Sequence, residues 1–564
     1  MATPNIVPRA DSEGGLGTAS KYWASAYIDA ITTTGNVVIG GTLTVSGADA
    51  ITIGDYILHA GDNSKFGFPS NDNFKVTLAG GDEFTISTSA AVFNTTLTAT
   101  SFNGIPFFSD ATNNSMYTHD VSGTDDTAAN NTAYGFTSLD AITTGDNNTA
   151  IGYNAGTALN TGSDNTLMGS FAGDALTTGV YNVAIGRSAL SAEDAHGYNV
   201  AVGAFALLNQ NAGTDAHNVA VGYNAGGAIT TGETNVIVGG LAGDALTTSS
   251  GNVVVGYSAL STEDTGRKNV AIGYKALHAQ NSDVDNYNVA VGYEAGESVT
   301  TGIYNTIIGG LAGDALTTGS NNIAIGYLAL SAEDEHGKNI AIGVNALAVQ
   351  DAGTDAFNVA IGYNVGDAIS TGVRNIIMGG FAGSALTTGS YNVAIGHGAL
   401  QSEDAHGLNT AVGMQALNAL NAGANGYNVA LGYQAGFAVS TGVDNTLIGA
   451  AAGDAITTSS QNVALGSSAL SALTIGTANT ALGYRSLFAS IDGDHNTAVG
   501  YKALEDYEDG DGNGHNTAVG SKSQLNASTG EFNTSLGSLS IGVGVTTGDN
   551  NVALGYNAAA VLTS

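Results

Sequence analysis

The chain has 564 residues, of which 81 are Gly, 4 are Pro, none is Cys and only 11% are charged. This composition excludes an ordinary globular mixture, a collagen, a flexible linker, disulfides and thiolate metal sites. The chain has 13 Lys and Arg residues and 48 Asp and Glu residues, which gives a formal charge of −35. Because this charge repels phosphate, we expect no nucleic-acid partner.

Residues 1–130 carry no long repeat. Residues 1–15, MATPNIVPRADSEGG, lack an apolar signal core, and no run of roughly 18 apolar residues occurs, so we expect neither Sec export nor membrane insertion. Further along, FKVTL and FTIST alternate around Gly80 and Gly81, which predicts a hairpin. We therefore expect small β-modules in residues 61–130, after a distinct region over residues 1–60.

From residue 131 onward one pentapeptide organises the chain. It reads Asn-φ-x-φ-Gly, where φ is apolar or Thr, and most copies recur with a period of 17. A longer step of 19 returns after every fourth copy, so cassettes of equal length begin at Asn148, Asn218, Asn288, Asn358 and Asn428. Such self-similarity indicates stacked repeats, with four-coil cassettes from 148 to 427 and irregular coils to 564.

Each copy is interpreted as one coil of a β-roll. The units are too short for a helix pair, and short β-branched runs between Asn and Gly favour strands with tight corners. Stacked Asn ladders are a further expectation. The fold class is therefore predicted as an all-β, elongated parallel β-roll or solenoid. Its 24 coil steps, at roughly 4.8 Å each, give a rod of about 115 Å.

Side-chain alternation predicts strands that are apolar on both faces. In the copy at Asn182, Val183 and Ile185 share one face and Ala184 points to the other. One face should fill the coil, and we expect the face of Ala184 to meet neighbouring chains in a homotrimer. In the second coil of each cassette this position is bulky, and these residues are predicted to fill the trimer axis: Leu167, Ile237, Ile307, Ile377 and Leu447.

Two acidic patterns are candidate ion sites. Asp509, Asp511 and Asn513 match the opening of a calcium-binding EF-hand loop, but the twelfth position is Gly520 and not Glu, so no cofactor is expected and Ca²⁺ stays an alternative. The third coils carry acidic loops. They are interpreted as a polar surface stripe, because successive loops lie roughly 19 Å apart and cannot share one ion. These loops contain Glu193, Asp194 and His196; Glu263 and Asp264; Glu333, Asp334 and His336; and Glu403, Asp404 and His406.

Tyr often follows the pentapeptide Gly. Exposed aromatic side chains at regular heights could stack on sugars or meet a receptor, and the alternative is a ladder that braces the corner. The candidates for receptor contact are those nearest the C-terminus, Tyr484, Tyr501 and Tyr556.

No catalytic constellation breaks the repeat. Paired carboxylates, a Ser with His and Asp, and phosphate-binding Gly loops do not stand out, so we predict a protein that is not an enzyme. A tailspike glycan hydrolase is an alternative. An ice-binding array is disfavoured, because the recurring Thr-Thr-Gly corners at residues such as Thr177 and Thr178 are interrupted in the third and fourth coils.

Two resemblances supply a biological context. The recurring NVAIG and NTAVG pentapeptides, from residue 131 to 564, resemble the head repeats of trimeric autotransporter adhesins, which form parallel β-rolls in threefold bundles. The segments DSEGGLGTASKYWASAYIDAI and TTGNVVIGGTLTVSG resemble the N-terminal region of tailed-phage fibre proteins. The second resemblance implies that residues 1–60, with Tyr22, Trp23 and Tyr27, attach to the virion.

The resemblances imply a structural phage fibre, made in the host cytoplasm and carried on the virion. Its expected partners are other virion proteins at the N-terminus and a host surface receptor or glycan, or a distal tip protein. A tail fibre for host adhesion is the main expectation. A capsid-decorating or spacer fibre without a receptor is the alternative.

Overall fold

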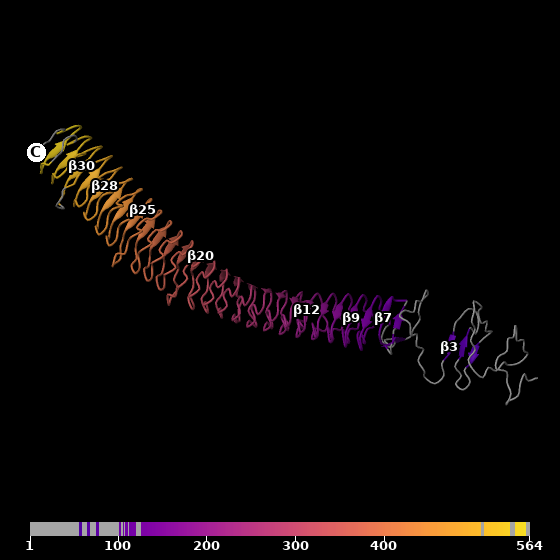
Figure 1. Cartoon of the computed structure of the whole chain (residues 1–564). Helices are drawn as coiled ribbons and strands as arrows, with labels where there is room; N and C mark the ends of the chain where they lie inside the picture. The colour runs from indigo at the N-terminus through magenta and orange to yellow at the C-terminus, as the bar shows by residue number, and fades with distance from the viewer. Residues whose placement is uncertain are drawn as a thin grey trace, which may run out of the picture. The chain divides into compact units, whose positions relative to one another are not determined.

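The computed structural model describes residues 112–119, 126–508, 513–541 and 547–559, together with the backbone of six short strands between residues 56 and 110. It divides the chain into a unit of residues 1–98 and a unit of residues 99–564 (Figure 1). The described residues form strands and turns, with no helix among them.

Within the N-terminal unit, the described strands form a small antiparallel sheet in the order β1-β2-β3. Its strands are β1 (Tyr56–Leu58), β2 (Lys65–Gly67) and β3 (Lys75–Thr77). β3 falls within the predicted FKVTL strand. Residues 1–55, with Tyr22, Trp23 and Tyr27, and the FTIST segment with its glycine turn lie outside the described residues.

The second unit is built from short strands that stack in sequence order. β4 pairs with β5, and β6 pairs with β7, both antiparallel; from β7 to β32 each strand pairs in parallel with the next. The register is conserved from coil to coil, as in Val183↔Val200. The predicted all-β parallel solenoid is thereby confirmed, with one coil for each strand from β8 to β32.

The strands of this unit are short and nearly uniform in length, and only β4 and β5 are shorter than the rest. They are β4 (Ser101–Phe102), β5 (Ile105–Pro106), β6 (Phe108–Asp110), β7 (Ser115–Tyr117), β8 (Thr132–Tyr134), β9 (Thr149–Ile151), β10 (Thr166–Met168), β11 (Val183–Ile185), β12 (Val200–Val202), β13 (Val219–Val221), β14 (Val236–Val238), β15 (Val253–Val255), β16 (Val270–Ile272), β17 (Val289–Val291), β18 (Thr306–Ile308), β19 (Ile323–Ile325), β20 (Ile340–Ile342), β21 (Val359–Ile361), β22 (Ile376–Met378), β23 (Val393–Ile395), β24 (Thr410–Val412), β25 (Val429–Leu431), β26 (Thr446–Ile448), β27 (Val463–Leu465), β28 (Thr480–Leu482), β29 (Thr497–Val499), β30 (Thr517–Val519), β31 (Thr534–Leu536) and β32 (Val552–Leu554).

A ladder of buried Asn side chains runs through the coils, as the sequence predicted. In the coil of Asn305, its backbone N–H donates to Asn288 Oδ1 at 2.8 Å, and its own Oδ1 accepts the N–H of Asn322 at 2.9 Å. Its Nδ2 donates to the carbonyl of Gly319 at 2.9 Å. The ladder therefore satisfies backbone groups that would otherwise be buried without partners, which explains why each coil begins with Asn.

The backbone conformation explains why the pentapeptide ends in Gly. Gly309 lies at φ +135°, a conformation that is essentially restricted to glycine, and a Cβ there would collide with the carbonyl of Gly326 in the next coil. The coils thus stack at a distance that leaves no room for a side chain at this position.

The core inside each coil is thin and consists mainly of the middle strand residue and a second row of Ala and Leu. Ala184, Ala189 and Leu190 are fully buried within a single chain. Where the middle residue is larger, Gly makes space for it: a Cβ on Gly156 or Gly173 would lie 2.6 or 2.8 Å from the side chain of Leu167.

The prediction that these bulky residues line a trimer axis is therefore wrong. Leu167, Ile237, Ile307, Ile377 and Leu447 are 0 to 1% exposed in one chain, so they fill the interior of their own coils and cannot line an axis between chains. The two faces were exchanged in the prediction. The outward face of the strands is formed by their first and third residues, such as Val183 and Ile185.

Candidate functional site

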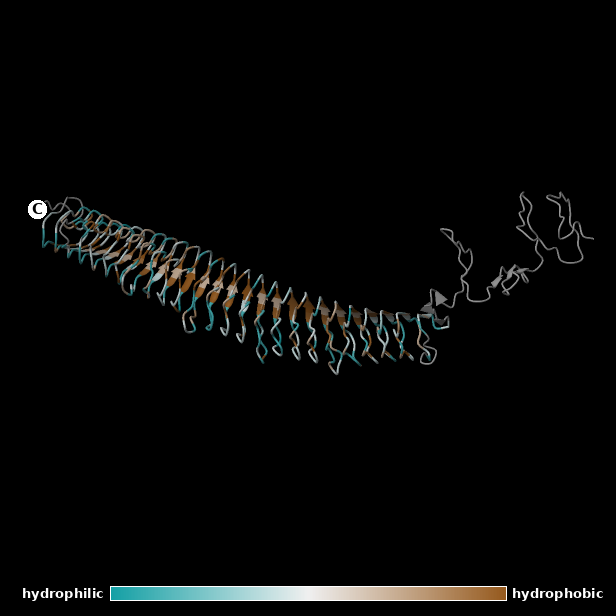
Figure 2. Ribbon diagram, turned by 60° about the horizontal axis from the view of Figure 1, so that its bottom comes forward, coloured by the Kyte–Doolittle hydropathy of each residue, from teal (hydrophilic) through white to brown (hydrophobic). Residues whose placement is uncertain are grey.

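The outward side of the stacked strands forms one long uncharged surface. We define the strand face as the first and third residues of β8 to β32, all of which are partly or fully exposed, while the middle residue is buried. These 25 strands contribute two positions each, 50 in all, and every one is Val, Ile, Leu, Met, Thr or Tyr. The strands accordingly form a continuous apolar band in Figure 2.

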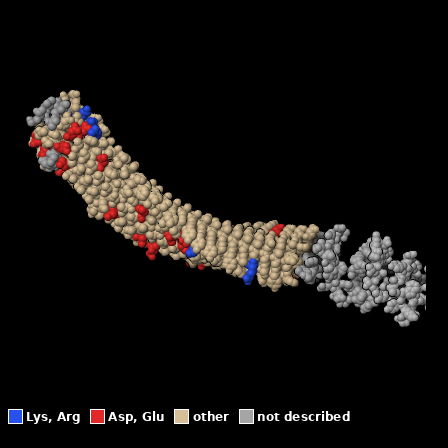
Figure 3. Space-filling view, viewed as in Figure 1, with Lys and Arg blue, Asp and Glu red and all other residues tan. Residues whose placement is uncertain are grey.

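Charged side chains lie away from the strand face. No residue of this face is Asp, Glu, Lys, Arg or His, although the chain carries a net charge of −35. In the view of Figure 3 the Asp and Glu residues form small separate patches, most of them near one edge of the stack. Monomeric proteins rarely expose a contiguous apolar patch of more than a few hundred Å², so the strand face is a candidate interaction surface.

Aromatic columns flank the strands at both ends. The post-Gly column, directly after the pentapeptide Gly, contains Tyr257, Tyr274 and Tyr293, whose ring centroids lie 5.9 and 5.2 Å apart in nearly parallel stacks. The pre-Asn column, directly before the pentapeptide Asn, contains residues at positive φ. There Tyr287 and Tyr304 stack at 5.7 Å. Stacked rings brace successive corners, since each covers its neighbour's face.

Several of the few cations are placed within the pre-Asn column. Lys338 Nζ lies 5.0 Å from the centre of the Phe357 ring. Arg374 lies 5.5 Å from the centre of the Tyr391 ring and donates a 2.6 Å hydrogen bond from Nη1 to the Tyr391 hydroxyl. Cation–π contacts of this kind add a modest stabilisation to an exposed stack. These cations therefore contact the neighbouring rings of the same column.

The three candidate receptor tyrosines lie at the surface. Tyr484 and Tyr501 are each 47% exposed and Tyr556 is 77% exposed. The rings of Tyr484 and Tyr501 stack on each other at 5.7 Å, so each has one covered face. Receptor contact through these rings stays a prediction. A receptor would reach their uncovered faces and their edges.

The acidic corners of the third coils differ from the predicted surface stripe. Glu193, Glu263, Glu333 and Glu403 are completely buried. They occupy the inward position that Leu159 and Leu176 fill in the first and second coils, so a carboxylate replaces an aliphatic side chain in the core of the third coil of each cassette. Asp and His beside them are partly exposed, and only this outer part of each loop is a polar surface.

Burial raises the pKa of the carboxyl groups of Glu263, Glu333 and Glu403. Loss of hydration is the main cause that raises the pKa of Glu333 to about 7, and the nearby carboxylates of Asp351 and Asp334 contribute to this rise. Burial also raises the pKa of Glu403 and that of Glu263, while hydrogen bonds from backbone N–H groups act in the opposite direction.

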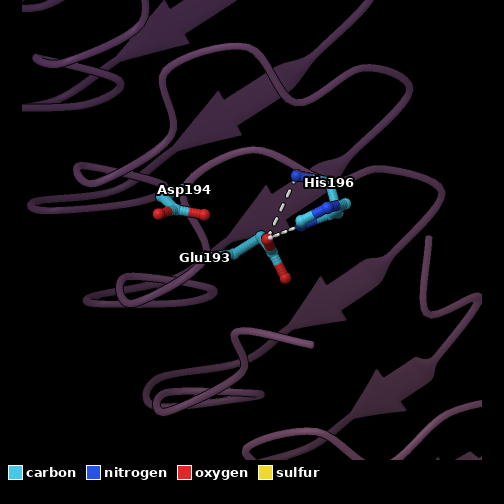
Figure 4. Close-up of side chains that lie close together, drawn as sticks. All are labelled: Glu193, Asp194 and His196. Atoms are coloured by element: carbon cyan, nitrogen blue, oxygen red, sulfur yellow. Dashed lines mark hydrogen bonds and ion pairs between the residues drawn. The ribbon is translucent and has the colours of Figure 1, made fainter. Parts of the chain in front are cut away.

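Glu, Asp and His side chains meet at three of these corners, where their ligand-type atoms lie within 4.8 Å of one another. Figure 4 shows the arrangement at Glu193: one carboxylate oxygen faces His196, and the other points away from both His196 and Asp194. The geometry therefore favours a Glu–His pair over a converging metal-ligand set. Of the predicted calcium ligands, Asp509 and Asp511 lie outside the described residues.

A shallow groove accompanies the third and fourth coils. In the second full cassette its lining includes Thr265, Arg267, Asp283, Asp285 and Tyr304, and an equivalent groove two cassettes later includes Ala405, Gly407 and Asn425. The longer loop of the fourth coil forms one wall. The extra length of every fourth coil thus creates a recurring surface feature that the sequence analysis missed.

Comparisons with known proteins do not assign a family. No family model matches the chain, and no curated protein matches it significantly. In the described part of the chain there is no helix with the length and hydropathy needed to cross a membrane.

Proposed function

We propose that this protein is a structural, non-enzymatic fibre of a tailed-phage virion, in which three parallel copies pack through their strand faces. The observation that carries the proposal is the strand face itself, 50 outward positions without a single charge. The resemblance of the N-terminal region to phage fibre proteins supports the virion context.

The size of the strand face fits a stable interface. Its 24 coil steps at roughly 4.8 Å give about 115 Å, and three residues at roughly 3.3 Å give a width of about 10 Å. The resulting area of roughly 1,100 Å² per chain exceeds the ~800 Å² per partner of a standard protein interface. Burial of this area would remove a long, mostly apolar surface from water.

A second copy of this chain is the occupant that fits best. An identical strand face has the same coil spacing over its whole length, so a parallel copy can match it coil by coil. It is also uncharged, and the chain's strong negative charge therefore does not oppose the contact at the interface. The similarity of the pentapeptides to threefold adhesin heads favours three copies.

A charge placed on the strand face tests the assembly. Ile376 is 42% exposed in the single chain, so Ile376→Glu lets the new carboxylate reach water in a monomer. In a trimer three carboxylates would be buried together, at a cost of several kcal/mol. We expect this variant to sediment as a folded monomer. The control Thr371→Glu places the same charge on an exposed turn just before this strand and should leave the mass unchanged.

Host adhesion is the proposed role of the fibre. Purified protein should bind host cells and compete with phage adsorption, and the substitutions Tyr484→Ala, Tyr501→Ala and Tyr556→Ala should weaken both effects. The matched controls Tyr257→Ala and Tyr274→Ala remove rings from the same column further along the stack. Equal loss in both sets would assign the tyrosines a bracing role.

A spacer fibre without receptor binding is the second candidate. It is favoured by the stacking of the post-Gly column, because Tyr274 has a ring on either side and presents only its edges. If purified protein neither binds cells nor competes with phage, the spacer role replaces adhesion.

A further inference from the structure

Four equivalent carboxylates, one in each cassette, are held in two different ways. Glu263 has a full set of donors: its Oε1 accepts the backbone N–H of Gly266 at 2.7 Å, and its Oε2 accepts Nδ2 of Asn286 at 3.0 Å and the N–H of Ser282 at 3.2 Å. Asn286 belongs to the long loop of the fourth coil. The carboxylate therefore ties the corner of the third coil to that loop.

The other three corners lack the asparagine. The residues equivalent to Asn286 are Ala216, Ala356 and Gly426, which offer no side-chain donor. Correspondingly, Oε2 of Glu193 and of Glu333 is buried without a hydrogen-bond partner. Buried carboxylate oxygens without donors are costly, so the corners of Glu193 and Glu333 need another source of positive charge or of a proton.

A histidine is present at each of these three corners. Nδ1 of His196 lies 3.4 Å from Glu193 Oε1, that of His406 lies 3.5 Å from Glu403 Oε1, and that of His336 lies 3.9 Å from Glu333 Oε1. The three Nδ1 atoms are buried and have no hydrogen-bond partner. Each imidazole thus presents a titratable nitrogen to a buried carboxylate (Figure 4).

Histidine and asparagine exclude each other at this corner. The residue equivalent to His196 in the Asn286 cassette is Gly266, and a Cβ on Gly266 would fall 2.4 Å from Asn286 Nδ2 and 2.6 Å from Glu263 Oε2. The chain therefore contains either His with a small partner or Gly with Asn. This paired exchange within one sequence indicates that His and Asn perform the same task for the carboxylate.

We propose that the three Glu–His pairs are proton-dependent clasps between the third coil and the long loop of the fourth coil, and that the Glu263–Asn286 corner is their proton-independent counterpart. A single proton shared by carboxylate and imidazole gives either a neutral pair or an ion pair, and both are tolerated in the core. Loss of that proton leaves a buried carboxylate beside a neutral ring, which weakens the clasp.

The surrounding charges favour protonation of the pair. Around Glu333 and His336 the third-coil corner carries Asp334 and Glu335, and the fourth-coil loop carries Asp351 and Asp355. Lys338 is engaged by Asp355 at 2.5 Å. The second-coil segment below the corner, residues 317–321, is uncharged. The charges of Asp351 and Asp334 oppose the ionisation of Glu333.

Each clasp controls a surface feature. Glu403 Oε2 accepts the N–H of Ala422 at 3.2 Å, and Gly407 N–H donates to Asn425 Oδ1 at 3.2 Å, so hydrogen bonds between backbone N–H groups and side-chain oxygens link the corner to the fourth-coil loop. Gly407 and Asn425 line the recurring groove. Deprotonation should therefore loosen the groove wall as pH rises, without unfolding the stack.

Hydrogen exchange of the full-length chain tests the clasp, in the presence of a chelator. After correction for the intrinsic rate, amides of residues 333–352 and 403–422 should exchange on the order of tenfold faster at pH 8 than at pH 6, as one pKa unit of differential interaction implies. Residues 263–282 are the internal control and should change little. Equal responses in all of these segments, or none, would overturn the proposal.

An exchange of residues supplies a second test. The double substitution His336→Gly and Ala356→Asn copies the Glu263 corner into the next cassette, and it should abolish the pH response of residues 333–352 while that of residues 403–422 persists. A persistent response in residues 333–352 would contradict the assignment. Because the clasp lies within one chain, it does not rest on the proposed trimer.

Discussion

The Asn ladder predicts that one side chain stabilises two neighbouring coils. Asn305→Ala would remove an acceptor for the N–H of Asn322 and a donor to the carbonyl of Gly319, and both bonds are buried in the wild-type corner. Each buried group left unsatisfied costs about 1–3 kcal/mol, so we expect a local loss of ~2–6 kcal/mol.

The loss should be local because each coil of a solenoid contacts only its neighbours. Hydrogen exchange of the full chain is therefore the suitable assay, and protection should fall around residues 305–322 but persist several coils away. Thr301→Ala, at an exposed turn of the preceding coil, is the matched control. If both variants exchange alike, the ladder does not stabilise the coils as argued.

Three further predictions concern the core and the corners, each checked by thermal unfolding followed by circular dichroism. Ile307→Asp should lower stability by several kcal/mol, since it buries an unpaired charge, and unchanged melting would show that this position meets water. Gly309→Ala should cost at least ~2 kcal/mol, from the positive φ and the collision with the next coil, whereas Gly310→Ala has space and should melt like the wild type. For Glu333 the folded pKa of about 7 lies above the ordinary value of 4.5, so its contribution to stability is fully present below pH 4.5 and is lost as pH rises to about 7. The loss is at most ~3 kcal/mol. The variant Glu333→Gln should flatten this part of the stability profile, and a profile that the substitution leaves unaltered would contradict the prediction.

Much of the fold follows from the sequence because its repeat is regular. The period, the parallel strands and the Asn ladder were all predicted from the pentapeptide. The inward face was predicted wrongly, because both sets of strand residues are apolar and alternation alone cannot separate them. A signal was present: Gly156 and Gly173 occur in the coils around Leu167, as expected if that Leu needs space inside the coil.

The candidate sites were harder to predict for a related reason. Glu193 and its equivalents were assigned to the surface by residue type, although they align with the buried Leu159 and Leu176. Their role depends on hydrogen bonds to the next coil, which no local pattern reveals. A comparison of the cassettes nevertheless shows in the sequence that His336 and Ala356 occupy the positions equivalent to Gly266 and Asn286.

The most direct test of the central claim is the mass of the purified full-length chain in solution, measured by light scattering. The account predicts three times the 56.0 kDa chain mass, because the uncharged strand face should be buried between parallel copies. A folded protein with the mass of a single chain would contradict it, since the strand face would then be stable in water without a partner.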